Sequence, residues 1–109
     1  MYLSEETKKR LEKHDSLRAI VFATYNETYD PIYLSPLTQW YRMRYNDRQE
    51  ELVENILHWD NDTIEDFYSW GHNSRWRHTF EADMECNFDD YVNTAIDIEE
   101  GEYDEDNDD

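Results

Sequence analysis

The most regular pattern in this sequence lies between Arg75 and Cys86, where one set of mostly apolar residues alternates with a polar set. The first set consists of Trp76, His78, Phe80, Ala82, Met84 and Cys86, and the second of Arg77, Thr79, Glu81, Asp83 and Glu85. A repeat of two residues is typical of a β-strand with one buried and one solvent-facing side. We therefore expect a strand here, with Cys86 packed at the end of its buried side.

Two other segments also favour strands. Residues 17–25 are rich in β-branched and aromatic side chains, among them Ile20, Val21 and Phe22, and these are enriched in strands. A turn is expected over residues 26–31, and residues 32–34 would then return as a short second strand. The two strands would form a hairpin.

Helices are expected where a capping residue precedes an amphipathic stretch. Ser4, Ser35-Pro36, Asn46-Asp47, Asp62 and Asn87 are such starts, and the patterns that follow them cover residues 5–14, 37–44, 48–59, 63–71 and 88–98. Residues 99–109 are so charged that we expect a disordered acidic tail. The predicted fold class is α+β, with a small, mainly antiparallel sheet packed against several short helices in a single domain over residues 1–98.

The charge of the chain is strongly one-sided. Its net charge is −18, and the segment from Thr79 to Asp109 carries fourteen acidic residues and no lysine or arginine. Aromatic residues make up 16% of the chain, whereas disordered acidic chains are poor in them. We therefore expect a folded aromatic core under an acidic surface, which would repel nucleic acid and anionic lipid and attract basic proteins.

The acidic residues suggest how such a partner would be bound. On a strand, Glu81, Asp83 and Glu85 would stand about 6.6–6.8 Å apart, close to two steps of a DNA strand at about 3.4 Å each. Fixed carboxylates at this spacing could imitate phosphates in a groove lined by lysine and arginine. The residues predicted to bind the partner are Glu81, Asp83, Glu85, Asp89, Asp90, Asp97, Glu99, Glu100, Glu50, Glu51 and Glu54.

Other classes of function find little support in the sequence. The histidines and the single cysteine form no paired metal-ligand motif, so neither a metal nor another cofactor is expected. No phosphate-binding loop or nucleophile motif is present, and we do not expect an enzyme. The longest apolar run covers only residues 19–23, too few to cross a bilayer, and we expect a protein of the host cytoplasm.

In kind, the sequence resembles the small acidic DNA mimics of phages and mobile elements, which inhibit restriction or CRISPR systems. The resemblance is carried by the acidic helix expected from Phe88 to Ile98 and by the tyrosine-bearing acidic segment from Glu99 to Asp106. It implies an inhibitor that occupies the nucleic-acid site of a host defence or DNA-processing protein. It also implies that a homodimer could lengthen the charged face.

Two alternatives share these electrostatics. An immunity or antitoxin protein would neutralise one cognate nuclease through a compact contact. An acidic chaperone for a basic protein would depend mainly on the segment from Glu99 to Asp109.

Overall fold

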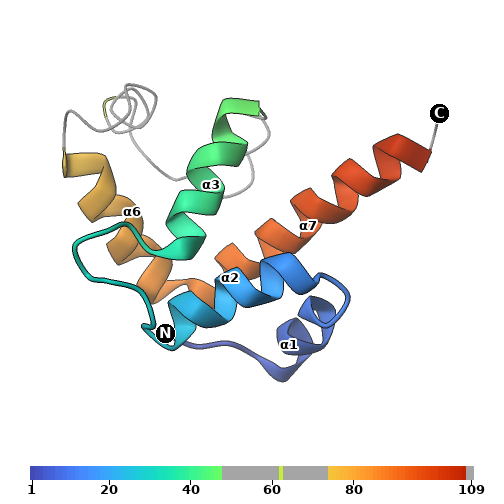
Figure 1. Cartoon of the computed structure of the whole chain (residues 1–109), viewed down its shortest axis with the longest axis horizontal. Helices are drawn as coiled ribbons and strands as arrows, with labels where there is room; N and C mark the ends of the chain where they lie inside the picture. Colours follow the sequence, from blue (N-terminus) through green and yellow to red (C-terminus); the bar gives the residue numbers. More distant parts are fainter. Residues whose placement is uncertain (48–61, 63–73, 108–109) are drawn as a thin grey trace.

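The computed structural model describes residues 1–47, 62 and 74–107, and every regular element within them is a helix. The helices are α1 (Glu5–Leu11), α2 (Asp15–Tyr25), α3 (Pro36–Asp47), α6 (Ser74–Cys86) and α7 (Phe88–Asn107). Helix α7 packs against α1, α2 and α6, and α2 packs against α3 (Figure 1). The predicted α+β class is therefore wrong, because the described residues contain no sheet.

The segment expected as the main strand is helix α6. Its fully buried side chains are Trp76, Phe80 and Met84, which are four residues apart and so lie on one side of a helix. A four-residue spacing also fits an alternating pattern, which explains the error. His78 and Ala82 separate the two interpretations, because a strand would bury them beside Phe80 and a helix would not. Both are exposed, as the helix requires.

The expected hairpin is also absent. Residues 15–25 form α2, with Leu17, Val21 and Thr24 buried at helical spacing, and residues 32–34 lie in an irregular loop. The Thr24 hydroxyl donates to the Ile20 carbonyl at 3.0 Å and accepts the Leu37 N–H at 2.9 Å. The spacing of the apolar residues, and not their β-propensity, decides the structure of this segment.

The helix starts expected at Ser4 and Ser35 are confirmed. The Ser4 side chain accepts the Thr7 N–H at 3.2 Å, and the Ser35 hydroxyl accepts the Thr38 N–H at 3.2 Å ahead of Pro36. Both bonds satisfy a backbone donor in a first helical turn. Asn46 and Asp47 lie within α3 and do not begin a new helix, and the helices expected over residues 48–59 and 63–71 lie outside the described residues. The helix expected after Asn87 begins at Phe88 but continues to Asn107, so the segment from Glu99, expected to be a disordered tail, is helical as far as Asn107.

The core of the described residues combines aliphatic side chains with the aromatic ones that the composition indicated. Tyr41 stacks edge-on against Phe80 and Tyr91, with ring centroids 5.6 and 5.9 Å apart, and its hydroxyl donates to the Tyr91 carbonyl. This cluster joins α3, α6 and α7. Burial raises the pKa of the Tyr41 hydroxyl well above its ordinary value, so this hydroxyl stays a neutral donor.

Candidate protein-binding site

The acidic residues of α6 do not form the expected row. Successive residues of a helix are turned by about 100°, so Glu81 and Glu85 share one side and Asp83 lies on another. Asp83 is used internally, since its carboxylate accepts the Tyr91 hydroxyl and an amide N–H of Asn87. The phosphate-like spacing predicted for a strand is lost with the strand.

Asp89 is also used internally, where α1 meets α7. Its carboxylate accepts the Ser4 N–H at 3.0 Å and the Thr7 hydroxyl at 2.7 Å. Burial opposes ionisation of this carboxyl, but the hydrogen bonds from Ser4 and Thr7 outweigh it and lower the pKa of Asp89. Asp89 therefore fixes the start of α1 against α7 and is poorly placed to receive a partner's lysine.

Further along the same contact, Arg10 joins two of the predicted acidic residues. Its guanidinium donates to Asp97 at 2.7 Å, to Glu100 at 2.9 Å and to Asn93 at 2.9 Å. The Arg10 hydrogen bond lowers the pKa of Glu100, and the imidazole of His14 lies 3.6 Å from the same carboxylate. These carboxylates are held by the protein's own cation.

We call this contact the α1–α7 polar seam and define it by Ser4, Thr7, Arg10 and His14 of the first segment and Asp89, Asn93, Asp97 and Glu100 of the second. Residues of each set follow one another at intervals of three or four positions, the spacing of neighbours on one side of a helix. That matching spacing is the sequence signal that could have identified the seam.

Outside α6 and the seam, the predicted residues divide into three cases. Glu99 forms an ion pair with Arg44 at 2.9 Å, which ties α7 to α3. Asp90 is exposed on the first turn of α7. Glu50, Glu51 and Glu54 lie outside the described residues.

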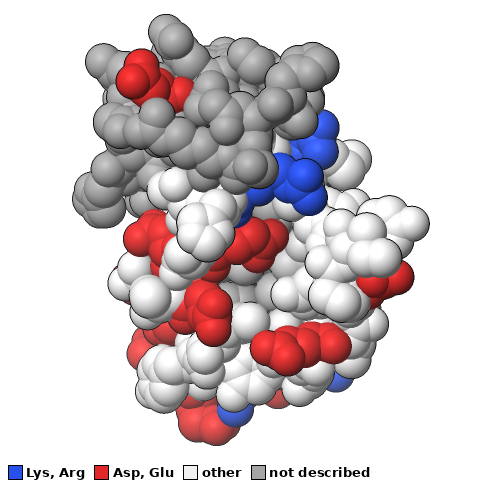
Figure 2. Space-filling view, turned by 90° about the vertical axis from the view of Figure 1, so that its left-hand side faces the viewer, with Lys and Arg blue, Asp and Glu red and all other residues white. Residues whose placement is uncertain are grey.

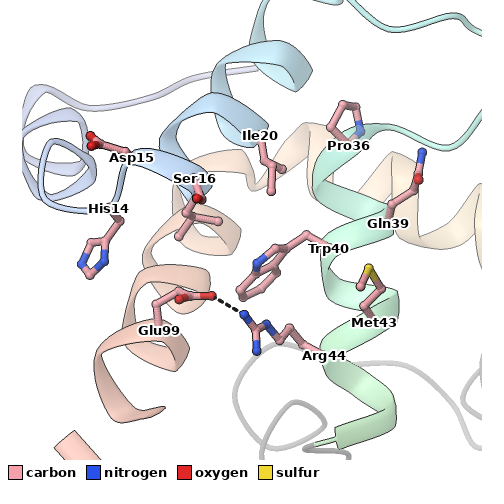
Figure 3. A pocket seen from close by; sticks show the side chains of 11 residues that line it. His14, Asp15, Ser16, Ile20, Pro36, Gln39, Trp40, Met43, Arg44 and Glu99 are labelled. Atoms are coloured by element: carbon pink, nitrogen blue, oxygen red, sulfur yellow. Dashed lines mark hydrogen bonds and ion pairs between the residues drawn. The ribbon is translucent and has the colours of Figure 1, made fainter. Parts of the chain in front are cut away.

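A groove of about 780 Å³ lies beside the Arg44–Glu99 ion pair. Its apolar lining includes Leu17 and Ile20 of α2 and Trp40 and Met43 of α3. In Figure 3, Ile20 and Trp40 lie between the two helices, and the ion pair spans the groove below Trp40. The Arg44 guanidinium lies 5.5 Å from the centre of the Trp40 ring, so the cation that pairs with Glu99 also covers the aromatic side chain.

A second hollow, of about 430 Å³, lies between α6 and the loop that follows α2. Three carboxylates line it, those of Glu27, Glu81 and Glu85. The other side chains that line it are mainly apolar or aromatic, together with one arginine and one histidine: Met1, Tyr29, Pro31, Tyr33, Leu34, Arg77, His78 and Met84. We call it the α6–loop hollow. Glu81 and Glu85 are thus the two predicted residues that the structure brings together in a concave site.

The pKa of Tyr29 shows that the charges of these three carboxylates act together on one side chain of the hollow. Burial and then the negative charges of Glu81, Glu27 and Glu85 raise the pKa of the Tyr29 hydroxyl. Figure 2 views the side of the molecule that carries α6 and shows acidic side chains spread over it, with most of the visible lysine and arginine gathered near its upper part. Sequence reasoning missed Glu27, because this residue comes from the irregular loop that follows α2.

Three further observations concern metal ligands, the cysteine and membrane-spanning helices. Among the described residues, no group of three histidine, cysteine, aspartate or glutamate side chains is placed to hold a metal ion. Cys86, which was predicted to pack in the core, is exposed. Within the same described part of the chain, no helix has the length and apolar character needed to cross a membrane.

No protein-family model, curated protein or solved structure matches the chain.

Proposed function

We propose that this protein is an inhibitor that binds the basic nucleic-acid-binding site of a host defence or DNA-processing protein in the cytoplasm and keeps nucleic acid out of it. The observation that carries the proposal is the surplus of negative charge, −18 over the whole chain. A net charge of about 2–8 is enough for solubility in a small domain. A surplus this large destabilises the compact state by self-repulsion, so a role in binding accounts for it better.

The surface carries much of this surplus. Exposed carboxylates occur on α1 and at its end, on α2, in the loop after α2, and on α6 and α7, namely Glu5, Glu6, Glu12, Asp15, Glu27, Asp30, Glu85, Asp90 and Asp97. Such a distribution attracts a basic protein from a distance and speeds its association, an effect that falls steeply with added salt. It also repels nucleic acid, so nucleic acid does not compete with the basic partner for the surface of this protein.

The helical fold changes how the inhibitor would act. Because Glu81, Asp83 and Glu85 lie on a helix and not on a strand, they form no straight row at the spacing of a DNA backbone. Asp83, Asp89, Asp97 and Glu100 have internal partners. A compact contact is therefore favoured over imitation of a long stretch of DNA. The concave α6–loop hollow makes an immunity-type protein, which neutralises one cognate nuclease, the second candidate.

The first experiment is affinity capture from host lysate on the immobilised protein, followed by elution with duplex DNA and, separately, with salt. We expect a nucleic-acid-binding protein to be retained and then released by DNA. A partner that resists DNA and leaves only at high salt would favour the immunity-type candidate. Retention of no nucleic-acid-binding protein would refute the proposal.

The captured protein then allows a functional test. Purified partner is mixed with labelled duplex DNA, and increasing amounts of this protein are added. A competitive inhibitor raises the partner's apparent Kd for DNA linearly with the inhibitor concentration, and the partner then binds either the inhibitor or DNA but not both at once. A ternary complex that contains all three would contradict the proposed mode of inhibition.

A further inference from the structure

The α6–loop hollow differs from the rest of the acidic surface because it combines carboxylates with accessible apolar side chains. Tyr33 is 67% exposed and Met1 40% exposed in its lining, and Ile32, next to Tyr33 in the sequence, is 78% exposed. Large apolar side chains that gather at a hollow mark interaction sites more often than single exposed ones do.

The carboxylates determine the sign of the charge that a group bound in the hollow should carry. Glu27, Glu81 and Glu85 contribute three negative charges to the lining, and Arg77 contributes one positive charge. The hollow therefore favours a cation by its local charge as well as by the charge of the whole chain. An anionic or purely apolar segment would leave these carboxylates near low-dielectric surface without compensation.

The loop holds these groups in defined positions. Glu27 has a φ of 53°, the left-handed conformation that ends many helices, and the next residue, Thr28, donates its N–H to the Ala23 carbonyl at 3.0 Å. The Asp30 side chain accepts the Ile32 N–H at 3.0 Å. On α6, Glu81 accepts the Ser35 N–H through Oε1 at 3.3 Å, which ties the helix to the end of the loop.

We propose that the α6–loop hollow is the anchor site for an arginine side chain from a basic segment of the partner protein, an inference that rests on the proposed function. The guanidinium would pair with Glu81 and Glu85, and its plane would stack on Tyr29 or Tyr33. Arginine suits this site better than lysine because its planar group can pair with carboxylates and stack on aromatic rings at the same time. Buried arginine and tyrosine contacts are common anchors of protein interfaces.

The test uses the full-length protein and two short probes, acetyl-Ala-Arg-Ala-amide and acetyl-Ala-Gln-Ala-amide, at millimolar concentration. Backbone chemical shifts are followed by NMR. We expect the arginine peptide to move signals of residues 27–35 and 77–85 and the glutamine peptide to leave them unchanged. Shifts spread over acidic segments throughout the protein would overturn the assignment.

Two matched variants sharpen the result. The substitutions Glu81→Gln and Glu85→Gln together remove two charges from the hollow, and Glu6→Gln with Glu12→Gln remove two exposed charges from α1 and its end. We expect the hollow variant to bind the arginine peptide about fivefold or more less tightly, the effect of losing two ordinary ion pairs. The control variant should lose less than about twofold in affinity. Equal weakening would show that only the overall charge matters and would refute a specific site.

The same variants separate this inference from the proposed function in the capture experiment. If the hollow variant still retains a nucleic-acid-binding protein that DNA releases, with undiminished affinity, the proposed function stands and the anchor site is wrong. If the wild-type protein retains no such partner but the arginine peptide still binds in the hollow, the anchor site stands and the partner class is wrong. Circular dichroism of each variant checks that the helical fold is kept.

Discussion

The substitution Arg10→Gln tests the α1–α7 polar seam most directly. The guanidinium contacts Asn93, Asp97 and Glu100 at 2.9, 2.7 and 2.9 Å. Without it, two carboxylates one helical turn apart on α7 lose the cation between them, in a chain that is already strongly negative. We therefore expect α1 to be held less tightly against α7.

The size of the effect follows from how exposed the groups are. The side chain of Arg10 is 32% exposed, and those of Asp97 and Glu100 are 67% and 43% exposed. Ion pairs in such positions contribute about 0.2–1 kcal/mol each, and the hydrogen bond to Asn93 adds about 0.5–1.5 kcal/mol. The expected loss in the free energy of unfolding is about 1–3 kcal/mol.

The matched control is Lys9→Gln, which removes the same charge from an exposed neighbouring position. Urea and thermal unfolding followed by circular dichroism give the two free energies. Since about 1 kcal/mol lowers Tm by roughly 4–8 °C in a domain of about this size, the difference is readily measured. In about 1 M salt the Debye length falls to about 3 Å, so the loss from Lys9→Gln should vanish and part of the loss from Arg10→Gln should remain. Equal losses for the two variants at low salt would refute the seam as a specific contact.

Three further predictions concern individual residues. Thr24→Val should cost about 1–3 kcal/mol in unfolding free energy, because the buried Leu37 N–H loses its acceptor, and Thr24→Ser should restore most of it. In α6, Ala82→Asp should unfold at nearly the wild-type Tm and Met84→Asp should not fold stably, since only Met84 is buried; equal destabilisation would favour the strand. The lowered pKa of Asp89 means that its contribution is present above the unfolded-state pKa and is lost as pH falls through the folded-state pKa. Asp89→Asn should therefore lower stability at neutral pH and flatten its decline in acid, as measured by urea unfolding across pH.

What could be predicted from the sequence was decided by local interactions. Ser4 and Ser35 mark helix starts because their side chains cap backbone N–H groups a few residues away, and no tertiary contact is needed for that. The pattern around α6 was ambiguous for a physical reason. Trp76, Phe80 and Met84 satisfy both a strand and a helix, and His78 and Ala82 are too weakly apolar to show which is correct.

The candidate site was harder to predict because it depends on how the helices dock. Asp89 and Glu81 are both acidic residues beside apolar ones in the sequence, yet one is taken up by α1 and the other lines a hollow. The different roles of Asp89 and Glu81 follow only from how α1 packs along α7 and how the loop packs along α6. Composition predicted that carboxylates would dominate the surface and could not assign any one of them to a partner.

The internal ion pairs also bear on where a basic partner would bind. At the α1–α7 polar seam, Arg10 already compensates Asp97 and Glu100, so a partner's cation would have to displace it. At the α6–loop hollow, three carboxylates share the lining with one arginine, and tyrosine side chains lie beside them. An incoming arginine thus gains charge compensation and aromatic contact in the hollow without breaking the ion pairs that hold α1 and α7 together. Arg10 and Arg44 pair with carboxylates of α7 and hold helices together, whereas the carboxylates of the hollow lie beside aromatic side chains that a cation from another protein can also contact.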